Sequence, residues 1–210
     1  MYKKALQHFQ STDPILFEAA KKVETFELSP AEDFFVELCS SIVGQQLSTK
    51  AADTIWSRFT ELFPNKKVTA AHLQTLEDDA IRAVGTSWAK IRSLKDLSRR
   101  VLMKELDLEH LRDKAGDYVH EALIQVKGIG PWTAEMFMMF SLAQPDVFSP
   151  GDAGLRRAIK LLYDLPTEPT ATELERMSAR WSPYRTYASR ILWKTLDAQP
   201  ILRRGSTHTK

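Results

Sequence analysis

Cysteine and long apolar runs are what this sequence most clearly lacks. Cys39 is the single cysteine in 210 residues, which excludes an intrachain disulfide, an all-cysteine zinc site and a four-cysteine iron-sulfur cluster within the chain. It lies on an apolar helical face, so we expect a buried structural thiol. No apolar run approaches the roughly 20 residues of a membrane span, and MYKKALQHFQ at the N-terminus contains no apolar signal region. We therefore expect a soluble, intracellular protein without a membrane partner.

A strong excess of charge of either sign is also missing. Charged residues make up 27% of the chain and the net charge is +2, which permits a nucleic-acid partner without indicating one. The basic clusters 65–67 and 99–100 fit either a phosphate contact or a solvated helix face. No combination of His, Asp and Glu has the spacing of a metal site. We expect the five histidines at the surface rather than as ligands: His8, His72, His110, His120 and His208.

Strand-like alternation is scarce, and helical periodicity dominates. Apolar residues recur at helical spacing within 35–43 and 51–63, and Ser48 is the predicted N-cap of the second helix. Two amphipathic helices therefore meet at Gly44–Ser48. Further stripes predict helices at 87–102, at 117–126, at 155–163 and, after a capping box of Thr172 and Glu175, around Met177. We expect an all-α fold of about ten helices without a sheet, and a disordered tail at 203–210.

The most informative segment is VKGIGPWTAE, Val126–Glu135. Gly128 and Gly130 permit a tight hairpin with a positive φ, and Pro131 suits the first position of a helix. Such a hairpin presents backbone amides beside a helix N-terminus, which suits a DNA phosphate oxygen. An ordinary turn between two helices explains these residues equally well.

A second segment, DVFSPGDAGLRR at 146–157, places Asp152 at the start of a helix. Asp is a favoured N-cap, so this residue alone indicates a helix cap. Its position one apolar helix after the glycine hairpin favours a functional carboxylate. That intervening helix, Trp132–Leu142, is apolar on nearly all sides and is expected to be a buried central helix.

In this combination the sequence resembles the helix-hairpin-helix GPD superfamily of DNA glycosylases, and within it the 3-methyladenine DNA glycosylase II type. The resemblance covers 34–193 and includes SIVGQQLSTKAA, VGTSWAKIRSLKDL, the hairpin, VFSPGD and RWSPYRTYASRILW, in that order. It implies a monofunctional enzyme that flips alkylated bases out of DNA and hydrolyses their N-glycosidic bond during base excision repair. Larger bacterial members carry an N-terminal β-rich domain, so the resemblance implies a minimal form.

The resemblance also assigns roles to individual residues. It places Gly128, Ile129, Gly130 and Thr133 at a phosphate-binding hairpin, and Asp152 on the aspartate common to the superfamily. Cleavage of a glycosidic bond gives the sugar oxocarbenium character, and a nearby carboxylate stabilises that charge or orients the attacking water. One Asp is sufficient for a cationic alkylpurine, which leaves readily without a general acid.

Members that also cut the DNA strand carry a nucleophilic lysine at the second residue after the hairpin. Here that residue is Trp132. An indole cannot form a Schiff base, and Lys127 precedes the hairpin, so we expect no lyase activity. An extruded cationic base suits a pocket of aromatic faces, for which we expect Trp132, Trp193 and Met136.

Trp193 points away from the apolar stripe of the last helix, which makes it a candidate for the pocket rather than the core. Packing against another element is the alternative. The aromatic residues of the stripe and of the preceding segment are expected in the core: Trp181, Tyr184 and Tyr187.

The gap left by a flipped base needs a residue to fill it. Gln46, in the turn between two helices, falls where the resemblance places the wedge that enters through the minor groove, and an exposed loop glutamine is the alternative. Gln45 and Ser48 are candidates for nearby backbone contacts. The resemblance implies a Na⁺ or K⁺ on the hairpin carbonyls of Ile124, Val126 and Ile129, and no cofactor that is required.

We therefore expect two helical lobes with a DNA-binding cleft between them. One lobe spans about 34–144 with the helix-hairpin-helix near 117–142, and the other combines 1–33 with 145–210. The expected partner is double-stranded DNA with damaged bases, bound by a monomer in the bacterial cytoplasm (nucleoid) or the eukaryotic nucleus. Three alternatives remain: a non-enzymatic DNA-binding module, a bifunctional glycosylase/lyase for oxidised bases, and a helical protein-interaction domain.

Overall fold

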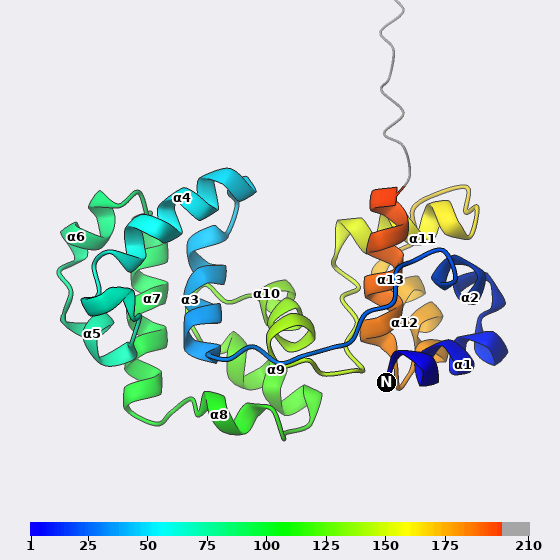
Figure 1. Cartoon of the computed structure of the whole chain (residues 1–210), viewed down its shortest axis with the longest axis horizontal. Coiled ribbons are helices and arrows are strands. Elements are labelled where there is room, and N and C mark those ends of the chain that lie inside the picture. The colour runs from blue at the N-terminus through cyan, green and yellow to red at the C-terminus, as the bar shows by residue number, and fades with distance from the viewer. Residues whose placement is uncertain (199–210) are drawn as a thin grey trace, which may run out of the picture. The chain divides into compact units, whose positions relative to one another are not determined.

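A computed structural model describes residues 1–198, and these residues form helices without a β-strand, which confirms the all-α prediction (Figure 1). The chain divides into two compact units. Unit 1 comprises Met1–Glu27 with Phe148–Lys210, and unit 2 comprises Leu28–Val147. The lobe boundaries expected from sequence lie close to these. The predicted disordered tail, 203–210, and His208 lie outside the described residues. None of the described helices combines the length and apolarity of a membrane-spanning segment.

Unit 2 contains most of the helices. They are α3 (Phe34–Gly44), α4 (Thr49–Thr60), the short η1 (Pro64–Lys66), α5 (Ala70–Thr75), α6 (Asp78–Ala83), α7 (Trp88–Leu102), α8 (Leu108–Leu111), α9 (Gly116–Ile124), α10 (Pro131–Met136) and the π-helix η2 (Phe137–Ser141). Unit 1 contains α1 (Tyr2–Thr12), α2 (Pro14–Ala20), α11 (Ala153–Leu162), α12 (Ala171–Ser178), the short η3 (Ala179–Trp181) and α13 (Arg185–Ala198). The expected number of about ten helices was too low, because helices as short as α6 and α8 show little apolar periodicity.

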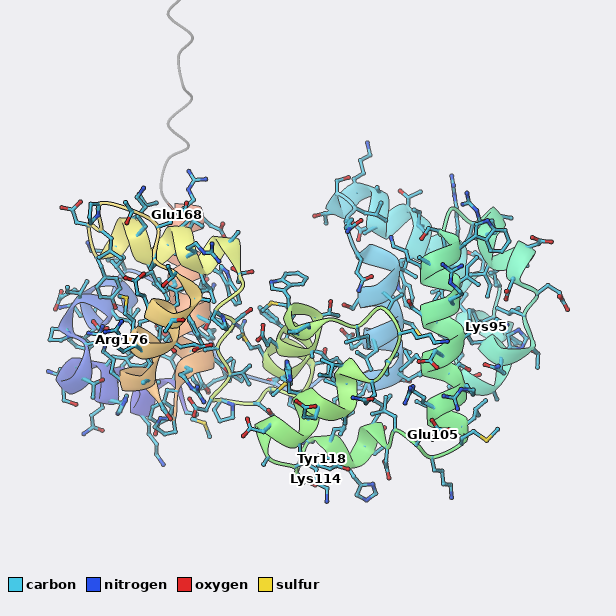
Figure 2. The ribbon with its side chains drawn as sticks, turned by 180° about the vertical axis from the view of Figure 1, so that it is seen from behind. Lys95, Glu105, Lys114, Tyr118, Glu168 and Arg176 are labelled. Atoms are coloured by element: carbon cyan, nitrogen blue, oxygen red, sulfur yellow. The ribbon has the colours of Figure 1, made fainter. Side chains whose placement is uncertain are left out.

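Helix α7 organises the core of unit 2. Its apolar face, which includes Ile91 and Leu94, is fully buried. The helix lies against α3, α5 and α6 (Figure 1). On another side of α7, the ammonium group of Lys95 donates to carbonyl oxygens at the end of α5, including that of Leu76 at 2.5 Å; Figure 2 labels this lysine beside the helix. Cys39 on α3 is completely buried, as predicted, and burial raises the pKa of its thiol well above the usual value.

Side-chain caps define several helix starts. Ser48 accepts a hydrogen bond from the Ala51 amide, so the predicted N-cap of α4 is confirmed. The capping box expected at Thr172 and Glu175 was wrong. The structure forms it two residues earlier, from Thr170 and Glu173, because Thr170 has the extended backbone of an N-cap whereas position 172 lies inside the first turn. The sequence contains T-x-x-E both at 170–173 and at 172–175. Only the extended backbone conformation at 170 shows which of the two forms the capping box.

The segment predicted as one buried helix, Trp132–Leu142, differs from the prediction in two ways. It begins as α10 and continues as the π-helix η2, whose wider turns change which side chains share a face. Trp132 is 50% exposed and Phe140 is 47% exposed. This segment is apolar on nearly all sides, yet it is not buried on all sides. This segment by itself leaves two large apolar side chains on the surface of unit 2.

A buried carboxylate joins three segments of unit 1. Asp13, only 2% exposed, caps α2 by accepting from the Leu16 amide at 3.1 Å. Its other oxygen accepts from the Tyr163 hydroxyl at 2.6 Å and from the Trp181 indole N–H at 2.8 Å. Burial, followed by the bond to Asp13, raises the pKa of Tyr163. Trp181 is fully buried, as expected from sequence.

We predict that Asp13→Asn destabilises the protein by about 2 kcal/mol, because an indole N–H can only donate and would face an amide NH₂ or lose its acceptor. Urea unfolding measures this as a lower midpoint. Glu18→Gln, an exposed change on the same helix that removes only a surface pair with Lys21, is the control and should leave the midpoint unchanged. Equal midpoints for both variants would contradict the structural role of Asp13.

Candidate nucleic-acid interface and active site

The predicted hairpin lies between α9 and α10, and its two glycines have different constraints. Gly128 has φ +79°, and a Cβ there would overlap the hydroxyl of Ser93 on α7. Only glycine fits this position without strain. Gly130 has φ −91°, and a Cβ there would meet no atom within 4 Å. Pro131 occupies the first position of α10, as predicted. Glycine at 130 is therefore not required by packing within unit 2.

The backbone amides of the hairpin are unequally available. The Lys127 amide donates to Asp96 on α7 at 3.0 Å, and the Ile129 amide donates to the Val126 carbonyl at 3.1 Å. Burial raises the pKa of Asp96, but the bonds from Lys127 and from Arg100 outweigh it, and the net pKa is lowered. No acceptor for the exposed Gly130 amide is present among residues 1–198. Ile129 is buried and its amide is already bonded, so the Gly130 amide is better placed than the Ile129 amide to donate to an external anion.

The turn between α3 and α4 is hydrogen-bonded to this hairpin. The Gln45 side-chain amide donates to the Gly128 carbonyl at 2.9 Å and lies 3.4 Å from the Thr133 hydroxyl. Gln46, the predicted wedge, follows with φ +57° and an exposed side chain. The half-buried Gln45 side chain is therefore directed at the hairpin, and its expected contact with the DNA backbone stays a prediction. Gln45 holds the turn in a strained, left-handed conformation that presents Gln46 to solvent.

The side chain of Thr133 is 6% exposed and lies against Gln45, so its hydroxyl has a structural partner. The reason is its position in the third residue of α10, which faces the core of unit 2. The phosphate-binding role of Thr133 stays a prediction, for which its backbone amide in the first turn of α10 is the remaining donor. The sequence pattern located the hairpin correctly but could not tell which of its polar groups face inward.

A pocket of about 420 Å³ lies in unit 2 beside the same turn. Its apolar lining includes Leu47, Met136 and Phe140, and its polar lining includes the carboxylate of Glu37 and the hydroxyl of Ser40. The sequence analysis identified Met136 but missed Phe140. The signal was present: Phe140 follows Trp132 and Met136 at four-residue intervals, the spacing of one helical face.

Asp152 belongs to unit 1 and is buried, with 9% of its surface exposed. It is the N-cap of α11, and its Oδ1 accepts from the Leu155 amide at 2.7 Å and from the Trp193 indole N–H on α13 at 3.0 Å. The cap is thus confirmed, and the indole bond is a second function of the same oxygen. A Cβ at Gly154 would lie 3.0 Å from Asp152 Oδ1 and 3.1 Å from Trp193 Nε1. Gly154, which the sequence analysis missed, leaves the space for this bond.

The structure therefore brings the predicted residues together in two groups. In unit 1 Asp152 contacts Trp193. In unit 2 the hairpin contacts the turn that carries Gln46, and Met136 lines the adjacent pocket. Trp193 is half-buried, which agrees with its position off the apolar stripe of α13.

The basic cluster at 99–100 has structural partners. Arg99 and Arg100 pair with Asp96 and Glu105, so these arginines organise the end of α7. His72 is half-buried and contacts the Leu62 carbonyl at 3.2 Å, rather than lying free at the surface as expected. Among residues 1–198, no group of three or more His, Cys, Asp or Glu side chains is arranged to hold a metal ion.

Known proteins are similar in sequence to this chain over most of its length. Residues 39–183 match the family model described as HhH-GPD superfamily base excision DNA repair protein. DNA-3-methyladenine glycosylase 1 of Schizosaccharomyces pombe is 33% identical over 163 residues, which cover 77% of this chain and 72% of that protein. DNA-3-methyladenine glycosylase of Saccharomyces cerevisiae is 30% identical, with 92% of this chain and 79% of that protein covered.

Two solved structures agree with the sequence comparisons. The crystal structure of DNA-3-methyladenine glycosidase from Bacillus halodurans has a TM-score of 0.86 at 36% identity and covers 92% of this chain and 89% of its own. The S. pombe 3-methyladenine DNA glycosylase in complex with abasic DNA has a TM-score of 0.79 at 29% identity, with 93% and 98% covered. With its glycine hairpin, its capping aspartate and a family match over 39–183, the chain belongs to the HhH-GPD superfamily of base excision DNA repair proteins.

Proposed function

We propose that this protein is a monofunctional DNA glycosylase that hydrolyses the N-glycosidic bond of alkylated bases, of the 3-methyladenine and 7-methylguanine type, in base excision repair. The observation that carries the proposal is the carboxylate of Asp152, buried and held through one oxygen by the Leu155 amide and the Trp193 indole. The relatives named DNA-3-methyladenine glycosylase supply the substrate class.

Asp152 stabilises charge that develops on the sugar. As the glycosidic bond breaks, the deoxyribose becomes oxocarbenium-like, and a fixed negative charge nearby lowers the barrier without reorganisation. Bonds from Leu155 and Trp193 to Oδ1 hold the carboxylate in one orientation before substrate arrives. The alkylated purine already carries positive charge, so it leaves without protonation by a general acid. Water completes the hydrolysis at the sugar carbon.

The reaction ends at base release. Trp132 occupies the second position after the hairpin, and its indole has no nucleophilic amine. Lys127 precedes the hairpin, with its backbone amide bound to Asp96. Strand cleavage is therefore not part of this protein's chemistry, which disfavours a bifunctional enzyme.

Each unit, taken by itself, offers apolar surface to a flipped base in this proposal. Trp132, Met136 and Phe140 offer apolar and aromatic surface in unit 2, where the pocket also contains the Glu37 carboxylate, a group that attracts a cationic base. Trp193 offers a ring face in unit 1 while its N–H is bound to Asp152. The DNA-binding cleft between the two lobes stays a prediction.

Double-stranded DNA with a damaged base is the proposed partner, bound by a monomer. The Gly130 amide at the start of α10 binds a phosphate oxygen, and Gln46 fills the space that the flipped base vacates. Carbonyl oxygens of Ile124, Val126 and Ile129 suit a Na⁺ or K⁺, since a carbonyl such as that of Val126, which accepts one amide, retains a second lone pair. The proposed location is the nucleoid or the nucleus, with the DNA.

A non-enzymatic hairpin module is the second candidate that the sequence left open. Such a module needs the hairpin but has no use for a pocket lined by an exposed aromatic side chain such as Phe140. We therefore favour the enzyme.

Asp152→Asn should abolish most release of free base from methylated DNA, by about 100-fold or more, because the amide keeps the helix cap but removes the negative charge. Base release is measured under single-turnover conditions, and DNA affinity is measured separately. The control is Asp33→Asn, the same change at the N-cap of α3, which should retain full activity. Wild-type protein that releases no base would overturn the proposed function; an active Asp152→Asn variant would overturn only the catalytic assignment.

Replacement of the two hairpin glycines should separate DNA binding from stability. Gly130→Ala meets no neighbour within the protein, so the unfolding midpoint should stay unchanged while affinity for every duplex falls several-fold, with or without a lesion. Gly128→Ala should instead lower the stability by about 1–3 kcal/mol, because of its positive φ and the Ser93 hydroxyl. Fluorescence anisotropy and urea unfolding report the two quantities. An affinity loss confined to damaged DNA would show that Gly130 does not bind phosphate.

Trp193→Phe should slow excision of a cationic and of a neutral lesion by a similar factor, about tenfold, because the ring is retained but the hydrogen bond to Asp152 is lost. Trp193→Ala should add a further loss of about thirtyfold for the cationic lesion, the equivalent of a desolvated cation–π contact of about 2 kcal/mol. Single-turnover excision of 7-methylguanine and of hypoxanthine, where the latter is a substrate, makes the comparison. Unchanged excision rates for Trp193→Phe would show that the hydrogen bond from the indole N–H to Asp152 does not contribute to excision.

A further inference from the structure

A second pocket, of about 480 Å³, lies in unit 1. Its residues belong to the loop between α11 and α12 and to α12 with η3; Figure 2 labels Glu168 on this loop and Arg176 on α12. Asp152 caps the start of α11, whereas the loop follows its last residue, so the length of a ten-residue helix, about 15 Å, separates them along α11. The pocket contains no residue proposed for base release.

One face of α12 and η3 forms a side of this pocket. Its members recur at intervals of three and four residues, the spacing of a single helical face. They are Glu173, Arg176, Met177 and Arg180. The neighbouring face, which includes Leu174 and Trp181, is fully buried in the core of unit 1. The helix therefore presents two arginines and a methionine beside its buried face, where packing within unit 1 does not need them.

The loop forms an apolar and stiff wall opposite these side chains. Leu165, Pro166 and Pro169 line it; Pro169 is buried, and Leu165 and Met177 are half-buried. Each proline ring fixes its φ angle and lacks a backbone N–H. A wall of this kind loses little conformational freedom when a ligand binds, and it offers apolar contact rather than hydrogen bonds. An aliphatic side chain is the group that complements it.

The two guanidinium groups are available to an acidic ligand. Arg180 is fixed within unit 1, because its Nε donates to the Met177 carbonyl at 3.0 Å and lies 3.7 Å from Asp13. Its terminal nitrogens donate to no acceptor within residues 1–198. Arg176 is exposed and forms no hydrogen bond or ion pair with those residues. Guanidinium groups bind carboxylates through pairs of charge-assisted hydrogen bonds.

The carboxylate of Glu173 does not neutralise this pair. Its Oε2 accepts from the Thr170 amide at 2.7 Å and from the Thr170 hydroxyl at 2.8 Å, and these bonds hold the pKa of Glu173 below its usual value. The carboxylate is therefore committed to the capping box of α12. Two guanidinium groups and one carboxylate leave the lining of the pocket with a net positive charge.

We propose that this pocket docks an extended segment of a partner protein in which Asp or Glu stands next to an aliphatic residue. The aliphatic side chain packs against the proline wall and Met177, and the carboxylate accepts from Arg176 and Arg180. Arginine clusters recognise acidic motifs in this way, and an apolar pocket beside them adds specificity for the neighbouring side chain. This docking site goes beyond the proposed glycosylase activity and does not depend on it.

Other occupants fit the pocket less well. A DNA backbone would match the arginines but would leave the apolar wall without a partner and would meet the Glu173 carboxylate. The chain's own segment 199–210 contains Arg203, Arg204 and Lys210 and no Asp or Glu, so it would bring like charges together. An acidic and aliphatic peptide complements both the charge and the apolar surface.

The test selects binders from a library of random decapeptides displayed on phage, with wild-type protein as the target and Arg176→Glu as the counter-target. The enriched peptides should carry Asp or Glu next to Leu, Ile, Val or Pro. By fluorescence anisotropy, a synthetic peptide of this kind should bind Arg176→Glu about tenfold more weakly or worse, and its Asn or Gln analogue should bind the wild type equally weakly. Pro166→Asp should also weaken binding, because it replaces apolar surface with a negative charge.

Arg112→Glu is the matched control, the same charge change at an exposed arginine of unit 2. It should keep the peptide affinity of the wild type, and both arginine variants should keep the wild-type unfolding midpoint. Arg176→Glu should release base from methylated DNA at the wild-type rate. The inference is overturned if no peptide depends on Arg176, if the enriched peptides are basic, or if Arg112→Glu loses as much affinity. A several-fold loss of duplex affinity in Arg176→Glu would assign the arginine to DNA and overturn it as well.

Discussion

The hydrogen bonds to one oxygen of Asp152 are the constraint on which unit 1 depends. The same Oδ1 begins α11 through the Leu155 amide and joins α13 through the Trp193 indole. A Cβ at Gly154 would lie 3.0 Å from Asp152 Oδ1 and 3.1 Å from Trp193 Nε1, which is tighter than an ordinary contact, so glycine leaves room for this bond. Helix capping and chemistry are therefore not competing explanations for this aspartate. In the proposed function, the carboxylate that caps α11 also supplies the fixed charge that a sugar cation needs.

In unit 2, hydrogen bonds fix a hairpin with exposed backbone amides and a turn with an exposed side chain. The left-handed Gly128 turns the chain, Asp96 holds the amide before it, and Gln45 holds its carbonyl. Each of these bonds uses up a polar group of the hairpin or of the turn. The Gly130 amide and the side chain of Gln46 are among the groups left outward. In the proposed function these two groups, which the interior does not need, contact DNA.

Some aromatic side chains are exposed, which lowers the stability of the protein but leaves these rings available for binding. Trp132 and Phe140 each leave about half of a large apolar surface in water. In a protein selected only for stability these residues would be buried or replaced, because each forgoes favourable burial. Both belong to helices that line the pocket of unit 2. This loss of stability fits the proposed function, in which exposed rings contact bases of DNA.

Local sequence patterns alone determined the all-α class, the hairpin with Pro131 as the first residue of a helix, the cap at Ser48 and the buried Cys39, because spacing and turn chemistry act over a few residues. The tertiary structure decided what depends on distant segments. It turned Gln45 and Thr133 inward, left Gly130 rather than Ile129 with a free amide, and joined Asp152 to Trp193, 41 positions away. No periodicity encodes which side of a helix meets a partner that far along the chain, since that choice is made by packing and by the pairing of buried polar groups.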